Sequence, residues 1–238
     1  MSASRFGRPR HHRRRCDSTN DIARELATAG APHGTVVTAD QQTAGRGRQG
    51  RSWIAPAGKA LLYSAIVRPL DERHLLLPLA APLAVAEAAE AVAPVRCAIK
   101  WPNDVWIEGR KCAGVLIEAR PQDLWAVVGV GLNVSIDPGE FPEELRHTAT
   151  SLNRGASVAE ALEALDEGLG RWVEAEPAQV LDEFRKRDAL RGREVSWAEG
   201  SGTAQGVDER GNLIVATGSG ARVTLGAGEV HLGPLSAS

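Results

Sequence analysis

The chain has 238 residues, of which 43% are hydrophobic and 24% are charged, and its formal net charge is −2. These values are typical of a globular protein of one or two domains and exclude a fibrous or largely disordered chain. Cys16, Cys97 and Cys112 have no metal-ligand spacing, and the N-terminus lacks the apolar stretch of a signal peptide. We therefore expect a cytoplasmic protein without disulfides.

The charge is unevenly distributed along the chain. Residues 1–15 hold six arginines and no acidic residue, and the other 22 basic residues face 30 acidic ones, so the rest of the chain carries −8. A basic arm can bind nucleic acid, but a short one is more often a frayed terminus. We predict that residues 1–16 form a basic, flexible arm that catalysis does not need.

The segment after this arm carries a helix start. Ser18 is the expected N-cap, and Asp21 occupies the capping-box position three residues later. Small and aliphatic residues then recur at helical spacing until Gly30, where the helix should end.

Short β-rich runs and one apolar helix follow. Residues 75–86 are apolar but fall short of the roughly 20 residues that cross a bilayer, so we predict a buried helix over 75–92 and no membrane span. Strands are expected at 34–40, 60–67, 95–100, 104–108, 112–118 and 124–130. The pattern predicts an α+β fold in which helices flank a mixed sheet.

The last third changes texture twice. Residues 137–153, rich in Pro, Gly, Glu and Thr, are expected to form a surface loop. Ser157 with Glu160 begins a capped helical region that breaks near Pro177. From residue 192 onward, short alternating runs separated by turns predict a small β-barrel.

The most informative segment is Gly45–Arg51, which lies between two predicted strands. Its three glycines allow backbone amides to approach an anion closely, and its three arginines offer charge and paired donors. Gly-Arg repeats also occur in disordered RNA-binding segments, but those are not usually placed between apolar strands. The context favours a loop that binds an anionic ligand.

Two further segments carry polar or glycine residues at strand ends. Lys100, Asp104 and Lys111 would place two cations and a carboxylate near one rim of the sheet, a mixture that suits phosphate with magnesium. An ordinary hairpin with solvated charges is an equally good interpretation of that spacing. In the strand 128–134, the glycines leave room for a flat ligand that Asn133 could contact, although strand glycines often serve packing alone.

Taken together, these motifs resemble those of biotin protein ligases in order and spacing. The matching segments are Ser18-Thr19-Asn20, Gly45–Arg51, Lys100–Asp104, Lys111–Gly114 and Gly129–Asn133. The resemblance implies a class II aminoacyl-tRNA synthetase-like catalytic domain over 17–190 and an SH3-like barrel over 191–238. Only sixteen residues precede Asp17, so we expect the enzyme-only class, which lacks the DNA-binding domain of some family members and has no specific DNA binding.

The resemblance also implies the reaction. Biotin and ATP, with Mg²⁺, would form biotinyl-5'-AMP, and the biotinyl group would pass to a lysine of the biotin carboxyl carrier domain of an acyl-CoA carboxylase. No prosthetic group is implied. The identity of the carboxylase, and the choice between a monomer and a homodimer, stay open.

Site residues follow by matching position. The implied biotin pocket consists of Ser18, Thr19, Asn20, Gln42, Arg46, Gly47, Arg48, Lys111 and Gly114. The implied ATP and adenylate contacts are Arg46, Arg48, Arg51, Trp53, Lys111 and Asn133. Lys111 and Arg48 are the expected catalytic residues, and Asp104 is the expected magnesium ligand. Cys112 stands where an aliphatic residue is usual, and no cysteine, nor His147, is given a catalytic role.

Two alternatives remain open. A lipoate or octanoate ligase would need a long apolar slot, whereas Gln42 and the segment 18–20 favour a polar ring. A nucleic-acid-binding regulator would use the arginine arm, but the acidic body of the chain argues against it.

Overall fold

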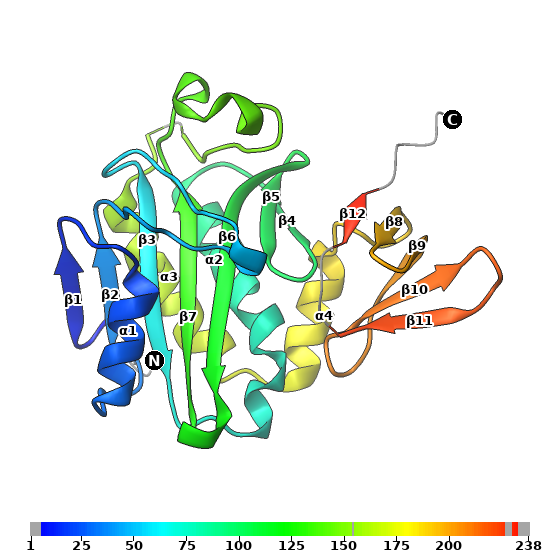
Figure 1. The fold of residues 1–238 in the computed structure, drawn as a ribbon, viewed down its shortest axis with the longest axis horizontal. Coiled ribbons are helices and arrows are strands. Elements are labelled where there is room, and N and C mark those ends of the chain that lie inside the picture. The colour runs from blue at the N-terminus through cyan, green and yellow to red at the C-terminus, as the bar shows by residue number, and fades with distance from the viewer. Residues whose placement is uncertain (1–5, 154, 227–229, 233–238) are drawn as a thin grey trace.

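A mixed sheet of seven strands forms the centre of the molecule. The computed structural model describes residues 6–153, 155–226 and 230–232 (Figure 1). The strands run in the order β1-β2-β3-β7-β6-β5-β4; β1 and β2 are parallel and every other neighbouring pair is antiparallel. Their bounds are β1 Arg10–Arg13, β2 Val36–Ala39, β3 Ala60–Val67, β4 Cys97–Lys100, β5 Asp104–Ile107, β6 Arg110–Arg120 and β7 Trp125–Asn133. The predicted mixed sheet with flanking helices is confirmed.

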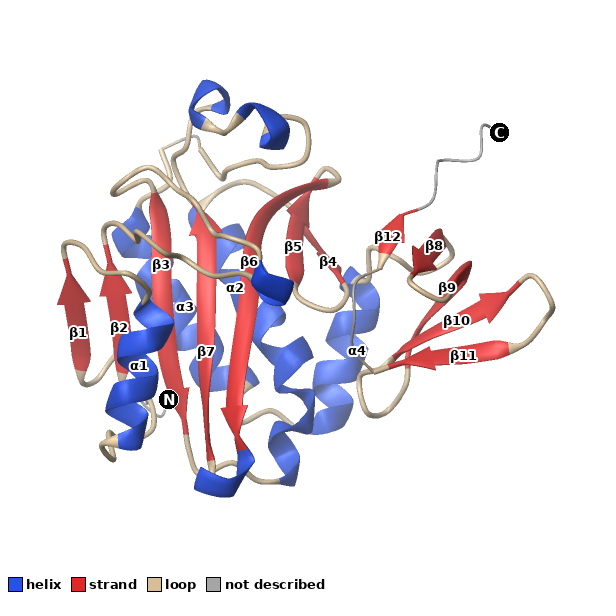
Figure 2. Ribbon diagram, viewed as in Figure 1, coloured by secondary structure: helices blue, strands red, loops and turns tan. Residues whose placement is uncertain are grey.

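Helices cover both faces of this sheet (Figure 2). Helix α1 (Thr19–Thr28) packs on one face through Ala23 and Ala27, which contact β2, β3 and β7. The helices on the other face are α2 (Leu77–Val92), α3 (Val158–Trp172) and α4 (Pro177–Arg187). Because both faces are covered, all eight residues of β3 are buried, which explains its nearly continuous apolar sequence.

The apolar helix belongs to this core. Among the described residues, Glu72–Val92 is the one helical segment long and apolar enough to cross a membrane. Its most apolar stretch of 18 residues has a mean hydropathy of 1.7, and 67% of that stretch is buried inside the protein. This burial confirms the prediction of a buried helix. Its first turn is the 3-10 segment η2 (Glu72–Leu76).

A second, smaller sheet follows the helices. Its order is β11-β10-β9-β8-β12, antiparallel throughout. The bounds are β8 Glu194–Trp197, β9 Gly200–Val207, β10 Leu213–Thr217, β11 Arg222–Leu225 and β12 His231–Leu232. The short runs predicted from sequence at 194–197, 205–207, 213–216, 222–225 and 229–232 correspond to these strands, although Glu229, the first residue of the last run, lies outside the described residues.

The small sheet shares its core with the large one. Val195, Leu213 and Val215 belong to the same buried cluster as the residues of α2 and β4. The Trp101 indole Nε1 donates a hydrogen bond to the Gly211 carbonyl at 2.9 Å, and the Ala189 amide donates to the Ile99 carbonyl at 2.9 Å. The expected boundary near residue 190 is therefore a change of sheet and not a gap between two cores.

The N-terminal segment differs from the prediction. Residues 10–13 form β1, which pairs with β2, and the Phe6 side chain is buried in the main core. The guanidinium of Arg10 forms ion pairs with the carboxylates of Asp166 and Glu163 on α3. The prediction of a flexible arm is wrong for residues 6–16, because backbone pairing and this ion pair fix a segment whose composition resembles a tail. Residues 1–5 lie outside the described range.

The two predicted helix caps differ in detail. Ser157 accepts a hydrogen bond from the Glu160 amide at 3.4 Å, as expected of a capping serine. Ser18 is the N-cap residue of α1, but its side chain makes no capping hydrogen bond. The side chain of Asp21 is bound by arginines instead of closing a capping box.

Candidate active site

The candidate site is a cavity of about 570 Å³ on the face of the large sheet that carries α1. Its walls are the connection between β2 and β3, the turn between β4 and β5, and the loop 137–153. In Figure 1, that first connection crosses in front of β7 and β6. Every residue that the sequence predicted for the site lines this cavity: Ser18, Thr19, Asn20, Gln42, Arg46, Gly47, Arg48, Arg51, Trp53, Asp104, Lys111, Gly114 and Asn133.

A network of short hydrogen bonds forms one end of the cavity. The Gln42 Oε1 atom accepts from the Thr19 amide at 2.7 Å and from Thr19 Oγ1 at 3.0 Å. The Ser64 hydroxyl lies 2.7 Å from Thr19 Oγ1 and 2.6 Å from Asn20 Oδ1, and Asn20 Nδ2 donates to Glu118 Oε2 at 2.7 Å. These bonds fix the orientation of the polar side chains before any ligand arrives.

Ser64 and Glu118 are site residues that the sequence reasoning missed. Ser64 carried a signal, because it is the one serine or threonine within the apolar strand 60–67. A buried hydroxyl needs a hydrogen-bonding partner, so such a residue indicates polar neighbours. Glu118 carried no comparable signal, since its partners come from distant segments.

Two glycines of β7 make space for two side chains. A Cβ atom at Gly129 would lie 2.1 Å from Asn20 Oδ1, and one at Gly131 would lie 2.3 Å from the Trp53 indole. The prediction assigned this room to a flat ligand. In the structure, the Trp53 ring covers Gly131 and the Asn20 amide covers Gly129, so these side chains form the ligand-facing surface.

The segment Gly45–Arg51 forms a small hairpin-like loop. The Gly47 amide donates to the Arg51 carbonyl at 2.7 Å, and the Trp53 amide donates to the Gly45 carbonyl at 2.8 Å. Gly50 has a φ of +74°, which favours glycine, and a Cβ atom at Gly45 would lie 2.4 Å from the Trp53 carbonyl oxygen. The glycines are therefore needed for the shape of the loop as well as for approach to an anion.

The arginines of this loop are bound to side chains around the cavity. Arg46 Nη2 lies 2.8 Å from Asp21 Oδ1 and 3.1 Å from Glu118 Oε2. Arg48 Nη1 donates to Asn103 Oδ1 at 3.1 Å. The two guanidiniums therefore point to different walls and do not converge on one point in this conformation.

Lys111 and Asp104 form an ion pair across β5 and β6. The Lys111 Nζ atom lies 2.6 Å from Asp104 Oδ1 and 5.8 Å from the centre of the Trp53 ring. A Cβ atom at Gly114 would lie 3.1 Å from Lys111 Nζ, so the glycine leaves space for the ammonium group. The predicted grouping of a cation with a carboxylate is confirmed for this pair, whereas the Lys100 ammonium lies over the Trp106 ring, 5.6 Å from its centre.

The loop 137–153 is bonded to the backbone of Lys111. The Lys111 amide donates to the Thr148 carbonyl, and the Thr150 amide donates to the Lys111 carbonyl, both at 2.8 Å. Asn133 Nδ2 donates to the Thr150 carbonyl at 2.9 Å. This predicted surface loop, which contains the 3-10 turns Pro138–Glu140 and Glu143–Leu145, thus forms a wall of the site.

The small sheet also reaches the cavity. Val230 and His231 line it from the start of β12. Sequence reasoning did not assign these residues to the site, because nothing in the sequence places a strand of the small sheet beside the large one.

The thiol of Cys112 is unsuited to catalysis. A hydrogen bond with the Cys97 side chain, together with burial, raises the pKa of the Cys112 thiol well above its usual value. A thiolate is far more nucleophilic than a thiol, so this environment argues against a catalytic role for Cys112.

The described residues contain no group of three or more His, Cys, Asp or Glu side chains that could hold a metal ion. A cage built by the protein alone is therefore absent from residues 6–153, 155–226 and 230–232. Mg²⁺ commonly binds through one or two carboxylates together with substrate phosphates. Asp104, which faces the cavity, fits that pattern.

Comparison with known proteins identifies the family. The model of the biotin/lipoate A/B protein ligase family matches residues 13–135, and that of the biotin protein ligase C-terminal domain matches residues 192–233. The chain belongs to the biotin/lipoate A/B protein ligase family. The two matches correspond to the main part of the large sheet and to the small sheet.

Individual members of the biotin/lipoate ligase family agree with this assignment. A biotin--[acetyl-CoA-carboxylase] ligase of Mycobacterium tuberculosis is 36% identical over 90% of this chain and 86% of its own. The bifunctional ligase/repressor BirA of Bacillus subtilis is 43% identical, but the match spans 58% of this chain and only 44% of that protein. A biotin protein ligase of Aquifex aeolicus, solved with biotin and ATP, superimposes with a TM-score of 0.78 at 31% identity, covering 94% of this chain and 97% of that one.

Proposed function

We propose that the chain is a biotin protein ligase, which activates biotin with ATP and transfers it to a lysine of a biotin carboxyl carrier domain. The observation that supports this proposal is that one cavity has two chemically different ends. One end is a prearranged polar network, and the other holds the Lys111–Asp104 pair beside an arginine-bearing loop.

The polar end suits the ureido ring of biotin, which offers one carbonyl acceptor and two N–H donors. Thr19, Asn20 and Gln42 are fixed by hydrogen bonds to one another, to Ser64 and to Glu118. Orientation before binding lowers the entropic cost of recognition. Ser18 and Gly47 line the same cavity and complete the proposed pocket.

A lipoate or octanoate ligase is the second candidate, because the family name includes lipoate ligases. An octanoyl chain offers neither a donor nor an acceptor to the polar network of Thr19, Asn20 and Gln42, whereas the ureido ring offers both. The match of residues 192–233 to a biotin protein ligase domain also favours biotin.

The cationic end suits the first chemical step. The biotin carboxylate oxygen attacks the α-phosphorus of ATP, the bond to the β-phosphate oxygen breaks, and pyrophosphate leaves. The Lys111 ammonium would stabilise the charge that develops on the α-phosphate, moving from the Asp104 carboxylate 2.6 Å away. Arg46, Arg48 and Arg51 would hold the phosphates from the loop side, while Trp53 and Asn133 would face the nucleotide.

Asp104 would hold Mg²⁺ together with ATP phosphate oxygens, once Lys111 has turned to the α-phosphate. The ion would neutralise phosphate charge and favour departure of pyrophosphate. Asp104 is the first residue of β5, where it pairs with Lys100 of β4 next to the turn that carries Asn103. The carboxylate is therefore held on a strand and not on a free loop.

In the second step, the amine of the carrier lysine attacks the carbonyl carbon of the mixed anhydride, and AMP leaves. Both steps depend mainly on position and charge, so no side-chain nucleophile is required. The acceptor in this proposal is the carrier domain of an acyl-CoA carboxylase. We also propose that the large domain has a class II aminoacyl-tRNA synthetase-like fold and that the small sheet is an SH3-like barrel.

The decisive experiment measures pyrophosphate release with biotin, lipoate and octanoate in parallel. We expect ATP-dependent release of pyrophosphate with biotin but not with lipoate or octanoate. Biotin should also be transferred to a purified carrier domain, and this transfer should be lost when the target lysine of that domain is changed to arginine. Gln42→Glu is a matched variant of nearly equal size, which should weaken biotin binding without affecting ATP binding. Release with octanoate at an equal or higher rate would refute the assignment to biotin.

A further inference from the structure

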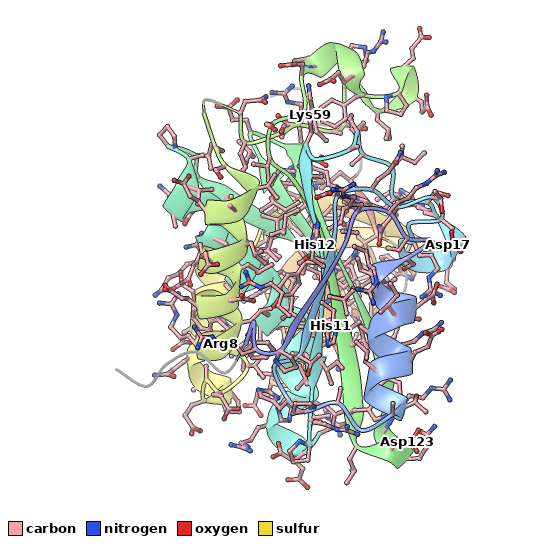
Figure 3. All side chains as sticks on the ribbon, turned by 90° about the vertical axis from the view of Figure 1, so that its left-hand side faces the viewer. Arg8, His11, His12, Asp17, Lys59 and Asp123 are labelled. Carbon is pink, nitrogen blue, oxygen red and sulfur yellow. The ribbon has the colours of Figure 1, made fainter. Side chains whose placement is uncertain are left out.

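A second cleft lies at the other end of β3, away from the candidate active site. It has a volume of about 610 Å³ and shares no lining residue with the first cavity. Its lining residues are Arg8, Pro32, His33, Arg68, Pro69, Arg73, His74 and Glu174. Figure 3 shows Arg8 on the side of the molecule that carries β1, beside helix α3.

Positive charge is concentrated in this cleft by the fold. Arg8 precedes β1, Arg68 follows β3, Arg73 lies in η2, and the single lining carboxylate, Glu174, follows α3. Three guanidiniums from three segments therefore face two carboxylates, Glu174 in the lining and Asp71 bound to Arg73, and the cleft keeps a net positive charge in a protein whose residues after the first fifteen carry −8. Like charges gathered in a concave site raise the local concentration of anions.

Two of the guanidiniums are held in place by neighbours. Arg68 Nη1 donates to the Ala31 carbonyl at 2.8 Å, which leaves its other N–H groups for a second acceptor. Arg73 is bound by the Asp71 carboxylate through Nε and Nη2, and its Nη1 lies 3.7 Å from Glu174 Oε2. Because this contact between Arg73 Nη1 and the Glu174 carboxylate is long, a bound anion could replace Glu174 as the partner of Nη1.

The histidines of the cleft are also fixed. The His33 ring packs edge-on against Phe6, with ring centres 4.8 Å apart, and its Nδ1 accepts from the Arg68 amide at 3.2 Å. His74 Nδ1 accepts from the Asp71 amide at 3.1 Å, and its side chain is 7% exposed. The two histidines and Arg68 are thus held by neighbouring groups in the cleft, whereas Arg8 and Arg73 lie at its exposed rim.

We infer that this cleft binds a phosphoryl group of a small molecule, at a site separate from the ATP-binding cavity. Guanidiniums from three directions match a tetrahedral anion with three or more acceptor oxygens better than a carboxylate, which one arginine can satisfy with its fork. The volume falls within the range of small-molecule sites and exceeds what orthophosphate alone would fill. The inference does not depend on the proposed ligase activity.

The test is calorimetric titration of the full chain at low ionic strength with inorganic phosphate and, separately, with glycerol 2-phosphate. The cleft variant is Arg8→Gln/Arg73→Gln, because both side chains are exposed and the fold should survive. The matched control is Arg13→Gln/Arg210→Gln, which removes the same charge from exposed positions elsewhere. Arg68→Lys, which keeps the charge but loses the fork, is a further variant, and Lys111→Ala reports on the active-site cavity.

We expect one saturable phosphate site whose affinity falls at least about tenfold in the cleft variant and in Arg68→Lys, and stays unchanged in the control and in Lys111→Ala. Tighter binding of glycerol 2-phosphate would support an organic phosphate as the ligand, and equal binding would support free phosphate. Equal losses in the cleft variant and the control, a loss confined to Lys111→Ala, or binding of a glutamate-rich peptide but not phosphate would each overturn the inference.

Discussion

Removing the N-terminal segment should destabilise the protein, contrary to what its composition predicts. Deleting residues 1–15 takes away β1, the buried Phe6 side chain and the Arg10 partner of Asp166. Loss of a buried Phe side chain costs about 3–5 kcal/mol. Breaking a buried ion pair costs about 3–5 kcal/mol, which we reduce to about 1–3 kcal/mol because Arg10 is about a third exposed. Since a domain is stable by about 5–15 kcal/mol, the truncated chain should be largely unfolded or insoluble.

The ion pair can be tested alone with Arg10→Gln. At about 1–3 kcal/mol, and with a urea dependence of about 3 kcal/mol per molar for a chain of this size, the unfolding midpoint should fall by about 0.3–1 M. Arg13→Gln is the matched control on the same strand, because the exposed Arg13 side chain donates to the carbonyl of the neighbouring His12 and not to a buried carboxylate. Its midpoint should stay within about 0.2 M of wild type.

The effect should depend on pH with a defined sign. Burial raises the pKa of the Asp166 carboxyl, while hydrogen bonds from Tyr63 and the charge of Arg10 oppose that rise. Without Arg10 the pKa should rise further. At a pH below the ordinary carboxyl pKa, Asp166 is protonated in both the folded and the unfolded state, so the variant loses little; above the raised pKa it is ionised in both, and the loss is complete.

Urea titrations at pH 3.5, below the ordinary carboxyl pKa of 3.8, and at pH 8 therefore check the reasoning. The difference between Arg10→Gln and wild type should be larger at pH 8. A difference that is equal at both pH values would show that Arg10 does not act through the Asp166 carboxylate. A truncated chain as stable as wild type would show that β1 does not stabilise the fold.

Three further predictions concern the site. Lys111→Ala should lower the rate of adenylate formation by roughly 10²–10³, measured as pyrophosphate release at saturating biotin; near-normal release would exclude the proposed role. Arg48→Gly, which removes the contact to Asn103, should loosen the loop, speed escape of the adenylate and label an unrelated protein; unchanged retention would indicate that the loop is a rigid anion site. Gly131→Ala, whose Cβ would lie 2.3 Å from the Trp53 indole, should displace that ring and weaken ATP binding about tenfold or more, as judged by calorimetry, whereas Gly139→Ala, at a glycine with open space around it, should leave binding unchanged.

Much of the fold could be predicted because local patterns and tertiary packing agree. The alternation of apolar runs and turns indicated β3, which begins and ends at the predicted residues 60 and 67. β1 could not be predicted, because Arg10–Arg13 has no apolar residue and becomes a strand only through its pairing with β2. An edge strand of this kind is defined by a partner distant in sequence, and a local sequence pattern does not contain that partner.

The candidate site divides in the same way. Motif residues such as Lys111 and Asp104 were predicted to lie together, and they form an ion pair. Glu118, which orients Asn20 and binds Arg46, has no motif of its own, since its role arises from contacts with α1 and the glycine-rich loop. The position of the Trp53 ring over Gly131 was also beyond the sequence, because it depends on how the loop folds back over β7.

The hydrogen bonds that join the backbone N–H and C=O of Lys111 to residues 148 and 150 have an evolutionary consequence. Insertions or deletions at 143–144, between the buried Phe141 and the Leu145 carbonyl that accepts the Thr148 and Ala149 amides, would leave those bonds in place. A change of length next to residue 149 would shift their register and move the lysine backbone. Drift in loop length among descendants of this chain should therefore accumulate in the outer part of the loop. The three residues that follow His147 should keep their spacing even where their side chains vary.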